Sequence, residues 1–302
     1  MLRRLFLFLA GRRWLRRWME ESPRAAVLTS RFVAGREIDD AIRVTERLNQ
    51  AGLWTTLDYL GESVTTLDEA ERARDIYLRL LDQIHARGLQ ANVSLKLTQF
   101  GLDLSEAACR ENVAAVARRA AEFGNFVRVD MESSAYTDRT LAVVHDLDEA
   151  CGCVGAVIQA YLYRSEADVE ELNCRRIRVR LCKGAYDEAP EVAFPRAAQV
   201  EASFRKLAES LLFRGNYPAL ATHDERLHAA LLRLAADNGV AKDAFEIQML
   251  YGIRRDLQVR LAAAGHRVRI YVPFGVAWYP YLMRRLAERP ANLYFVVRNL
   301  FR

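Results

Sequence analysis

The stretch RVRIYVPFG, Arg267–Gly275, is the last of eight short β-rich runs that recur along the chain. The runs alternate with segments whose apolar residues recur at helical spacing. The seven earlier runs are WTTLDYLGE from Trp54, NVSLKL from Asn92, NFVRVDME from Asn125, VGAVIQAY from Val154, RIRVRLCK from Arg176, YPALATHD from Tyr217 and FEIQMLYG from Phe245. Eight strands alternating with helices over about 250 residues predict an α/β fold of the (β/α)8 TIM-barrel type.

Helices are predicted over residues 66–87, 105–123, 137–150, 195–213, 225–236, 253–264 and 277–288, with a weaker one over 165–173. Thr66 is expected to cap its helix, with Glu69 three residues further on in the capping-box position. A doubly wound sheet is the alternative fold, but its glycine-rich first turn is not found in the sequence. We therefore expect an N-terminal helical extension over residues 1–45 and one barrel domain over 46–302.

The composition is that of an ordinary globular protein, with 51% hydrophobic and 27% charged residues among 302. The five cysteines are odd in number and irregularly spaced, and no pair forms C-x-x-C. These features predict buried thiols in a reducing compartment, and no metal site is expected. A cytoplasmic protein is the resulting expectation.

The first seventeen residues carry six arginines, so the net charge of +5 says little about the rest of the chain. On a helix, Trp14, Leu15, Trp18 and Met19 would share one face, opposite a face of arginines. This pattern predicts either peripheral contact with the inner face of the cell membrane or a helix packed on its own domain. The apolar run over residues 5–10 is too short to span a bilayer.

Polar side chains at the ends of the predicted strands are the candidates for function, because barrel active sites lie at the C-terminal strand ends. Lys96 and Asp130 stand out, since a charged group inside an apolar strand is costly unless it is paired. We expect these two residues to pair with each other. The ring of strand ends is mostly cationic and aromatic, which suits a planar cofactor together with a small carboxylate.

The segment YPYLMRRLAERP, from Tyr279 to Pro290, adds a tyrosine and two arginines near the end of the chain. On a helix, Tyr281 lies three and four residues before Arg284 and Arg285, so the three side chains can share one face. The pattern predicts either an anion clamp with an aromatic lid or a solvated basic patch.

Several of these segments occur together in one known family. NVSLKLTQFGLD, VRVDME, VIQAYLYR, RVRLCKGAY, ATHD, FEIQMLYG and IYVPFG follow one another in family order and end in WYPYLMRRLAERPAN. Over about residues 58–292, the sequence resembles the proline dehydrogenase family. The resemblance implies a distorted (β/α)8 barrel that binds FAD, oxidises L-proline to Δ1-pyrroline-5-carboxylate and passes electrons to membrane quinone. A separate pyrroline-5-carboxylate dehydrogenase would then act downstream.

The resemblance also implies roles for individual residues. The catalytic residues would be Lys96, Asp130 and Arg180, and the substrate would contact Lys96, Leu250, Tyr271, Tyr281, Arg284 and Arg285. The cofactor would contact Met131, Gln159, Arg180, Lys183, Gly184, Ala185, Tyr186, Thr222, His223 and Asp224. The stretch GAYDEAP departs from some relatives after its tyrosine, which leaves the role of Asp187 open.

Two other functions compete with this one. A cofactor-free barrel lyase or aldolase would form a Schiff base on Lys96 or Lys183. A membrane-binding or nucleic-acid-binding protein would act through the N-terminal arginines, although no nucleic-acid partner is expected.

Overall fold

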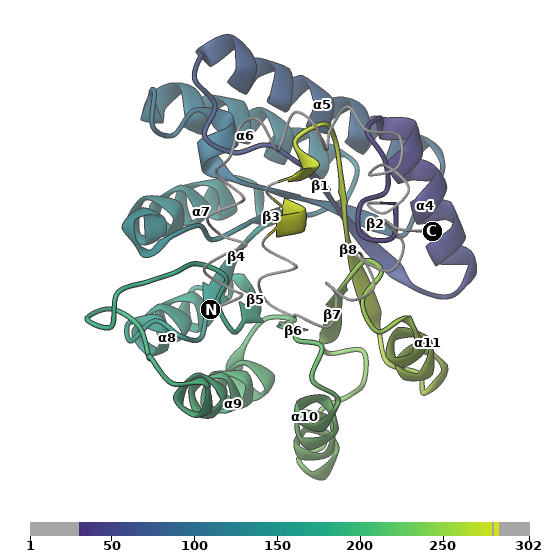
Figure 1. Ribbon diagram of the computed structural model, residues 1–302, viewed down its shortest axis with the longest axis vertical. Helices are drawn as coiled ribbons and strands as arrows, with labels where there is room; N and C mark the ends of the chain where they lie inside the picture. The colour runs from purple at the N-terminus through teal and green to yellow at the C-terminus, as the bar shows by residue number, and fades with distance from the viewer. Residues whose placement is uncertain (1–29, 280, 284–302) are drawn as a thin grey trace, which may run out of the picture.

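The strands form a closed parallel barrel in the computed structural model, which describes residues 30–279 and 281–283 (Figure 1). The order follows the chain from β1 to β8, and β8 pairs with β1 to close the barrel. The strands are β1 Trp54–Tyr59, β2 Ala91–Leu95, β3 Val127–Val129, β4 Val154–Gln159, β5 Arg178–Cys182, β6 Ala219–Ala221, β7 Glu246–Leu250 and β8 Val268–Phe274. The predicted (β/α)8 fold is confirmed, with each strand inside its predicted run or within one residue of it.

Helices surround the barrel, one after each strand from β1 to β7 within the described residues (Figure 1). They are α4 Ile38–Gln50, α5 Leu67–Ala86, α6 Glu106–Glu122, α7 Thr137–Cys151, α8 Ser165–Cys174, α9 Ala197–Arg214, α10 Glu225–Asp237 and α11 Arg255–Ala263. Two short 3-10 helices, η1 Leu97–Phe100 and η2 Ser134–Tyr136, follow β2 and β3. Of the helix predicted over 277–288, the described residues 278, 279 and 281–283 are helical, and the remainder lies outside the described residues.

Side-chain caps set where α5 and α6 begin. The Thr66 hydroxyl accepts a hydrogen bond from the Glu69 amide, as predicted, and Ser105 caps α6 in the same way through the Ala108 amide. The Glu69 carboxylate accepts from the amide of Thr65, at 2.8 Å, one residue before the cap. Each cap satisfies an amide that the helix itself leaves without a partner.

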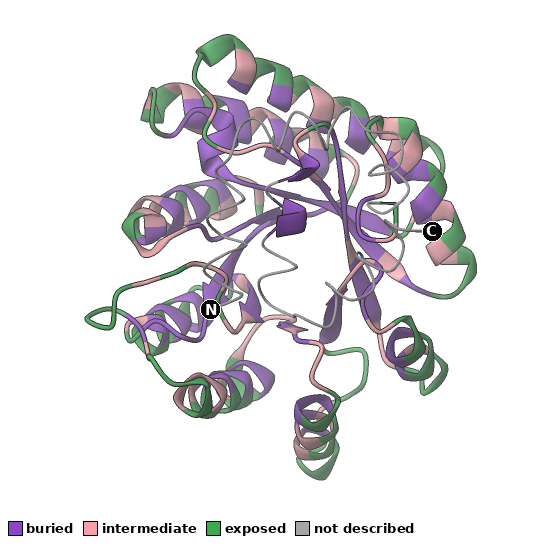
Figure 2. Ribbon diagram, in the orientation of Figure 1, coloured by how far each residue is buried: buried purple, intermediate pink, exposed green. Residues whose placement is uncertain are grey.

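Buried residues lie on the strands and on the barrel-facing sides of the helices (Figure 2). Helix α4 belongs to this core, since Ala41, Ile42 and Val44 are buried in the same cluster as the strands. The predicted domain boundary at residue 45 therefore falls within α4. Residues 1–29 lie outside the described residues, so the predicted N-terminal helix stays a prediction. Among the helices that the structure describes, none is both long and apolar enough to cross a membrane.

The five thiols are all free, but they are not equally buried. Cys109 and Cys153 are buried, as predicted, whereas Cys174 is exposed. Cys174 is the last residue of α8, and Cys151 and Cys182 are only partly buried, so the prediction that all five thiols are buried was wrong.

Charged side chains fill the N-terminal end of the barrel interior. The strand register places Arg128 beside Gly155, and Gly155 beside Arg178. The Arg128 guanidinium donates to the carbonyls of Ala156 and Arg178, at 3.0 and 2.6 Å. A side chain at position 155 would lie within 2.7 Å of that guanidinium, so glycine leaves the room that Arg128 occupies.

A buried ion pair completes this layer. The Arg269 guanidinium lies 2.8 Å from one carboxylate oxygen of Glu246, and it also donates to the carbonyl of Thr55. Burial opposes the charge of Glu246, but Arg269 outweighs it and holds the pKa of that carboxyl below its usual value. The N-terminal end of the interior is therefore filled, and the open volume lies at the C-terminal end.

Candidate active site

A cavity of about 440 Å³ opens at the C-terminal ends of the strands. The predicted site residues that line it are Lys96, Asp130, Met131, Gln159, Arg180, Lys183, Gly184, Ala185, Tyr186, Thr222, His223, Asp224, Leu250, Tyr271 and Tyr281. Arg284 and Arg285 lie outside the described residues, so their predicted clamp stays a prediction. The fold thus brings together every predicted site residue that the structure describes.

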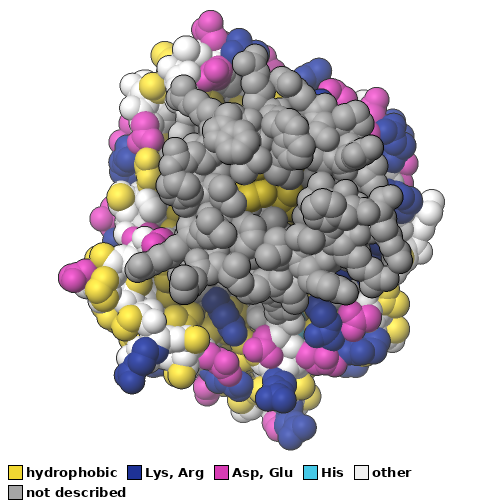
Figure 3. Space-filling model, in the orientation of Figure 1, with side chains coloured by type: hydrophobic (Ala, Val, Ile, Leu, Met, Phe, Trp, Pro, Cys, Tyr) yellow, Lys and Arg dark blue, Asp and Glu magenta, His cyan; other side chains and the backbone are white. Residues whose placement is uncertain are grey.

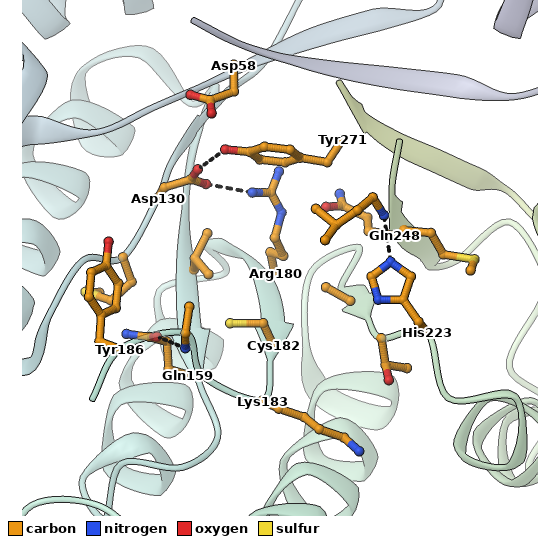
Figure 4. Close-up of a pocket in the computed structure, with 18 of the residues that line it drawn as sticks. Asp58, Asp130, Gln159, Arg180, Cys182, Lys183, Tyr186, His223, Gln248 and Tyr271 are labelled. Atoms are coloured by element: carbon orange, nitrogen blue, oxygen red, sulfur yellow. Dashed lines mark hydrogen bonds and ion pairs between the residues drawn. The ribbon is translucent and has the colours of Figure 1, made fainter. Parts of the chain in front are cut away.

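Asp130 is the centre of the hydrogen-bond network in this cavity (Figure 4). It directly follows β3 and accepts hydrogen bonds from Ser94 at 2.6 Å, from Arg180 at 2.6 Å and from the Tyr271 hydroxyl at 2.7 Å. Burial alone would raise the pKa of Asp130, but Arg180, Lys96 and these hydrogen bonds outweigh it and lower the pKa below its usual value. Asp130 is therefore held as a carboxylate with its oxygens occupied.

The expected ion pair of Lys96 with Asp130 is present, but Lys96 has a second and closer partner that was not predicted. The Lys96 amine lies 3.2 Å from a carboxylate oxygen of Asp58 and 3.8 Å from the nearer oxygen of Asp130, whose closest cation is Arg180. The reason is the position of β2 between β1 and β3, which sets Lys96 between a carboxylate on each side. Burial disfavours the ammonium, yet the two carboxylates outweigh it and raise the pKa of Lys96 above its usual value.

Arg180 presents unused hydrogen-bond donors in the cavity wall. One terminal nitrogen contacts Asp130 and Ser94, whereas Nε and the other terminal nitrogen are buried without a hydrogen-bond partner among the described residues. The guanidinium also lies over the ring of Tyr271, 5.2 Å from its centre. Buried donors are nearly always satisfied in folded proteins, and these two nitrogens can donate to an electron-rich group in the cavity.

The segment Lys183–Tyr186, which follows β5, forms another part of the cavity wall. Gln159 fixes it, because its side-chain oxygen accepts from the Ala185 amide at 3.0 Å while its nitrogen donates to the carbonyl of Glu132. Gly184 has φ +131, and a side chain there would come within 2.4 Å of the Tyr161 ring. Both the positive φ and the nearby Tyr161 ring therefore require glycine at this position.

Gly184→Ala is expected to lower the free energy of unfolding by about 1–3 kcal/mol, because it adds a clash with Tyr161 to an unfavourable backbone conformation. The matched control is Gly239→Ala, where φ is +72 and no atom lies within 4 Å of the added methyl group. In that control the free energy of unfolding should fall by only about 1 kcal/mol, the cost of the backbone conformation alone. Urea denaturation measures both, and equal losses would show that the Tyr161 contact is unimportant.

The side chain of His223, which follows β6, forms a hydrogen bond to the end of β7 at the edge of the cavity. Nε2 of His223 accepts a hydrogen bond from the Leu250 amide at 2.9 Å, which requires that this nitrogen carries no proton (Figure 4). Asp224 caps α10 through the amides of Arg226 and Leu227 and lies 3.6 Å from the Lys183 amine. Asp224 thus orients both the start of α10 and a cationic side chain of the cavity wall.

Comparison with known proteins agrees with this geometry. The sequence model of the proline dehydrogenase family matches residues 41–298. The chain belongs to the proline dehydrogenase family. It is 38% identical to proline dehydrogenase 1 of Bacillus subtilis over the full length of both chains. Over 91% of this chain and 90% of the relative, it is 41% identical to the proline dehydrogenase of Deinococcus radiodurans.

Proline utilization A (PutA) from Bdellovibrio bacteriovorus, solved after inactivation by N-propargylglycine, is similar in structure with a TM-score of 0.81 and 28% identity. The match covers 87% of this chain and 32% of that one, so this chain spans about a third of that relative. Proline dehydrogenase activity, an oxidoreductase reaction of proline catabolism, thus rests on the family and on its barrel fold.

Membership of the proline dehydrogenase family decides between the alternative functions. A Schiff-base lysine must lose its proton to attack a carbonyl. Lys96 is instead held as an ammonium between Asp58 and Asp130. Its position agrees with binding of an anionic group and argues against a Schiff base on Lys96.

The structure adds cavity residues that the predicted site did not include. They are Asp58, Val157, Cys182, Ala221, Gln248 and Met249. Asp58 and Gln248 are polar residues near the ends of the predicted strands, but neither was given a role in the predicted site. Asp58 is, like Asp130, a carboxylate inside an apolar run, WTTLDYL. The Gln248 amide donates to Glu246, and its oxygen is buried without a partner among the described residues.

Proposed function

We propose that the chain oxidises L-proline to Δ1-pyrroline-5-carboxylate in this cavity, with FAD as the electron acceptor. The observation that carries the proposal is Arg180, which is anchored on Asp130 and has two buried nitrogens without a partner among the described residues. Fixed positive charge stabilises negative charge that develops nearby during a reaction. When bound, FAD supplies the two-electron acceptor that no side chain of the protein provides.

The residues present fit a flavin on two grounds. The unpartnered donors of Arg180 suit an electron-rich ring edge, and the half-buried Lys183 adds a second cation to the wall. The residues proposed to hold FAD are Met131, Gln159, Arg180, Lys183, Gly184, Ala185, Tyr186, Thr222, His223 and Asp224.

The substrate is proposed to occupy the side of the cavity formed by β1, β2, β7 and β8. Lys96 offers an ammonium for the proline carboxylate, while Leu250 and Tyr281 offer apolar surface for the ring. Arg284 and Arg285 are proposed to complete the carboxylate grip from outside the described residues. Holding the substrate in one orientation supplies much of the rate enhancement that the protein itself provides.

Asp130 is proposed to orient the site and not to remove the proton from the substrate amine. Its oxygens already accept from Ser94, Arg180 and Tyr271, and its pKa is lowered, so its affinity for a proton is weak. Burial and the nearby Asp130 carboxylate raise the pKa of Tyr271 well above its usual value, so that hydroxyl stays protonated as a donor. Asp130 thus fixes Arg180 and Tyr271 in the positions that the reaction uses.

We further propose that electrons leave through membrane quinone and that a separate pyrroline-5-carboxylate dehydrogenase consumes the product. The amphipathic pattern of residues 12–19 supports peripheral contact with the inner face of the membrane, where a quinone dissolves. Such contact would leave the protein in the cytoplasm with one surface on the bilayer.

The purified protein is expected to be yellow and to release FAD on denaturation. With L-proline and an artificial acceptor, mass spectrometry should detect a product two hydrogens lighter than proline. Pyrrolidine has the same ring without the carboxylate and is the matched control, for which turnover should be far slower. A protein that neither contains FAD nor takes it up when it is added contradicts the proposal.

A further inference from the structure

The connection between β5 and α9, residues 183–196, is long and carries the cavity-lining segment Lys183–Tyr186 at its start. Its outer half is attached to the connection after β4 by backbone hydrogen bonds from Tyr163 to Val192 and from Phe194 to Tyr161. Figure 1 shows this connection running outward past α8 before it returns to α9, and hydrophobic side chains gather at that side in Figure 3. Tyr163 and Val192 are 45% and 40% exposed. The loop thus lies largely outside the core, and local contacts must hold it in place.

Glu188 supplies such a contact midway along the loop. One carboxylate oxygen accepts from the Ser134 amide at 2.7 Å, and the other accepts from the Ser134 hydroxyl at 2.5 Å. Ser134 begins η2, where a backbone amide has no partner within the helix, so the carboxylate satisfies a helix start as well as a side chain. Hydrogen bonds to a charged group are about twice as strong as neutral ones.

Tyr161 connects this contact to the cavity wall. Its hydroxyl lies 3.5 Å from Glu188, and its ring packs against Gly184, where an added side chain would come within 2.4 Å. Burial, followed by the Glu188 carboxylate, raises the pKa of Tyr161. Ser134, Tyr161 and Glu188, here called the Glu188 clasp, thereby join the connections after β3, β4 and β5 behind Gly184.

We propose that Glu188 is a positioning residue for the cofactor, whose clasp with Ser134 and Tyr161 holds the segment Lys183–Tyr186 against bound FAD. The inference rests on the FAD site proposed above. It assigns a role to Glu188 in the stretch GAYDEAP, next to Asp187, whose role stays open. Releasing the clasp should loosen the segment and shorten the time that FAD stays bound.

The test compares Glu188→Ala with the parent protein in two measurements. The first is the rate of FAD release, followed by the fluorescence of the freed flavin. The second is hydrogen–deuterium exchange of the amides of residues 183–186, measured without FAD. Glu188→Ala should release FAD about tenfold faster, equivalent to ~1.4 kcal/mol. The Ala185 amide should exchange faster, whereas KM for proline with saturating FAD should stay within about twofold.

Glu188→Gln keeps one oxygen acceptor in the same shape, and its FAD release should fall between those of the parent and Glu188→Ala. Glu191→Gln is the matched control, because Glu191 lies on the same loop, is exposed, and makes no hydrogen bond or ion pair with the described residues. It should behave as the parent does. The double variant Ser134→Ala/Glu188→Ala should accelerate FAD release by less than the product of the two single-variant factors, because both changes remove the same contact.

Unchanged FAD release and unchanged exchange in Glu188→Ala would overturn the proposal, even if the variant melted at a lower temperature. If the parent binds no FAD, the proposed function fails. The exchange measurement then still decides whether the clasp orders the segment, because it does not require the cofactor.

Discussion

Asp130→Ala is expected to lower kcat/KM for L-proline by a factor of roughly a hundred to several thousand. The change leaves the buried Arg180 guanidinium without a carboxylate and the Tyr271 hydroxyl without its acceptor. Removing one partner of a buried ion pair typically costs about 3–5 kcal/mol, and about 1.4 kcal/mol corresponds to a factor of ten in rate. Steady-state kinetics with saturating FAD measures the loss, and circular dichroism shows whether the barrel remains folded.

Two further variants sharpen this test. Asp130→Asn keeps the shape and one oxygen acceptor but removes the charge, so it should retain more activity than the alanine variant. Asp243→Asn removes the same charge at an exposed position between α10 and β7, and it should leave kcat/KM unchanged within about twofold. If Asp130→Ala keeps kcat/KM within about threefold of the parent, the network around Asp130 is structural and does not serve the reaction.

Arg180→Met is expected to reduce kcat by roughly a hundredfold to a thousandfold, the loss typical of one electrostatic contact made at the reacting centre. Methionine fills a similar volume but supplies neither the charge nor the donors that Arg180 presents in the cavity. The midpoint potential of the bound flavin should fall, because the cation that favours the reduced state is lost. Potentiometry of the purified protein measures that shift independently of turnover.

Arg180→Lys restores a charge but not a planar guanidinium, so it should recover only part of the loss. Arg178→Met is the matched control on the same strand, since Arg178 does not line the cavity and stacks on Phe126 and Tyr217. Arg178→Met should leave the flavin potential unchanged. An Arg180→Met protein with the potential and kcat of the parent would show that Arg180 serves only to neutralise Asp130.

The barrel could be predicted because the patterns that specify its strands and helices lie within short stretches of the sequence. Apolar runs of strand length alternate with helical periodicity, and parallel strands order themselves along the chain in a closed barrel. Helix starts with a side-chain signal, such as Thr66 and Ser105, could be placed for the same reason. Strand ends then pointed to Lys96 and Asp130 without knowledge of all their partners.

Contacts across strands could not be predicted in this way. Lys96 and Asp130 were expected to pair because both are charges within apolar runs, but the sequence does not say that Asp58 lies closer on the other side. Gln159 and Asp224 were expected to contact the cofactor, and both also make protein contacts that position the cavity wall. The contact of Glu188 with Ser134 links residues 54 positions apart through a loop without periodicity. No pattern in the sequence indicates it.

The central claim is that L-proline reduces FAD within the cavity organised by Asp130 and Arg180. Anaerobic titration of the FAD-loaded protein with L-proline, followed at the visible absorption band of the flavin, tests it most directly. The parent protein should bleach on addition of L-proline, and in stopped-flow measurements both Asp130→Ala and Arg180→Met should bleach far more slowly. If the FAD-loaded parent does not bleach with L-proline, or if both variants bleach at the rate of the parent, the claim is wrong.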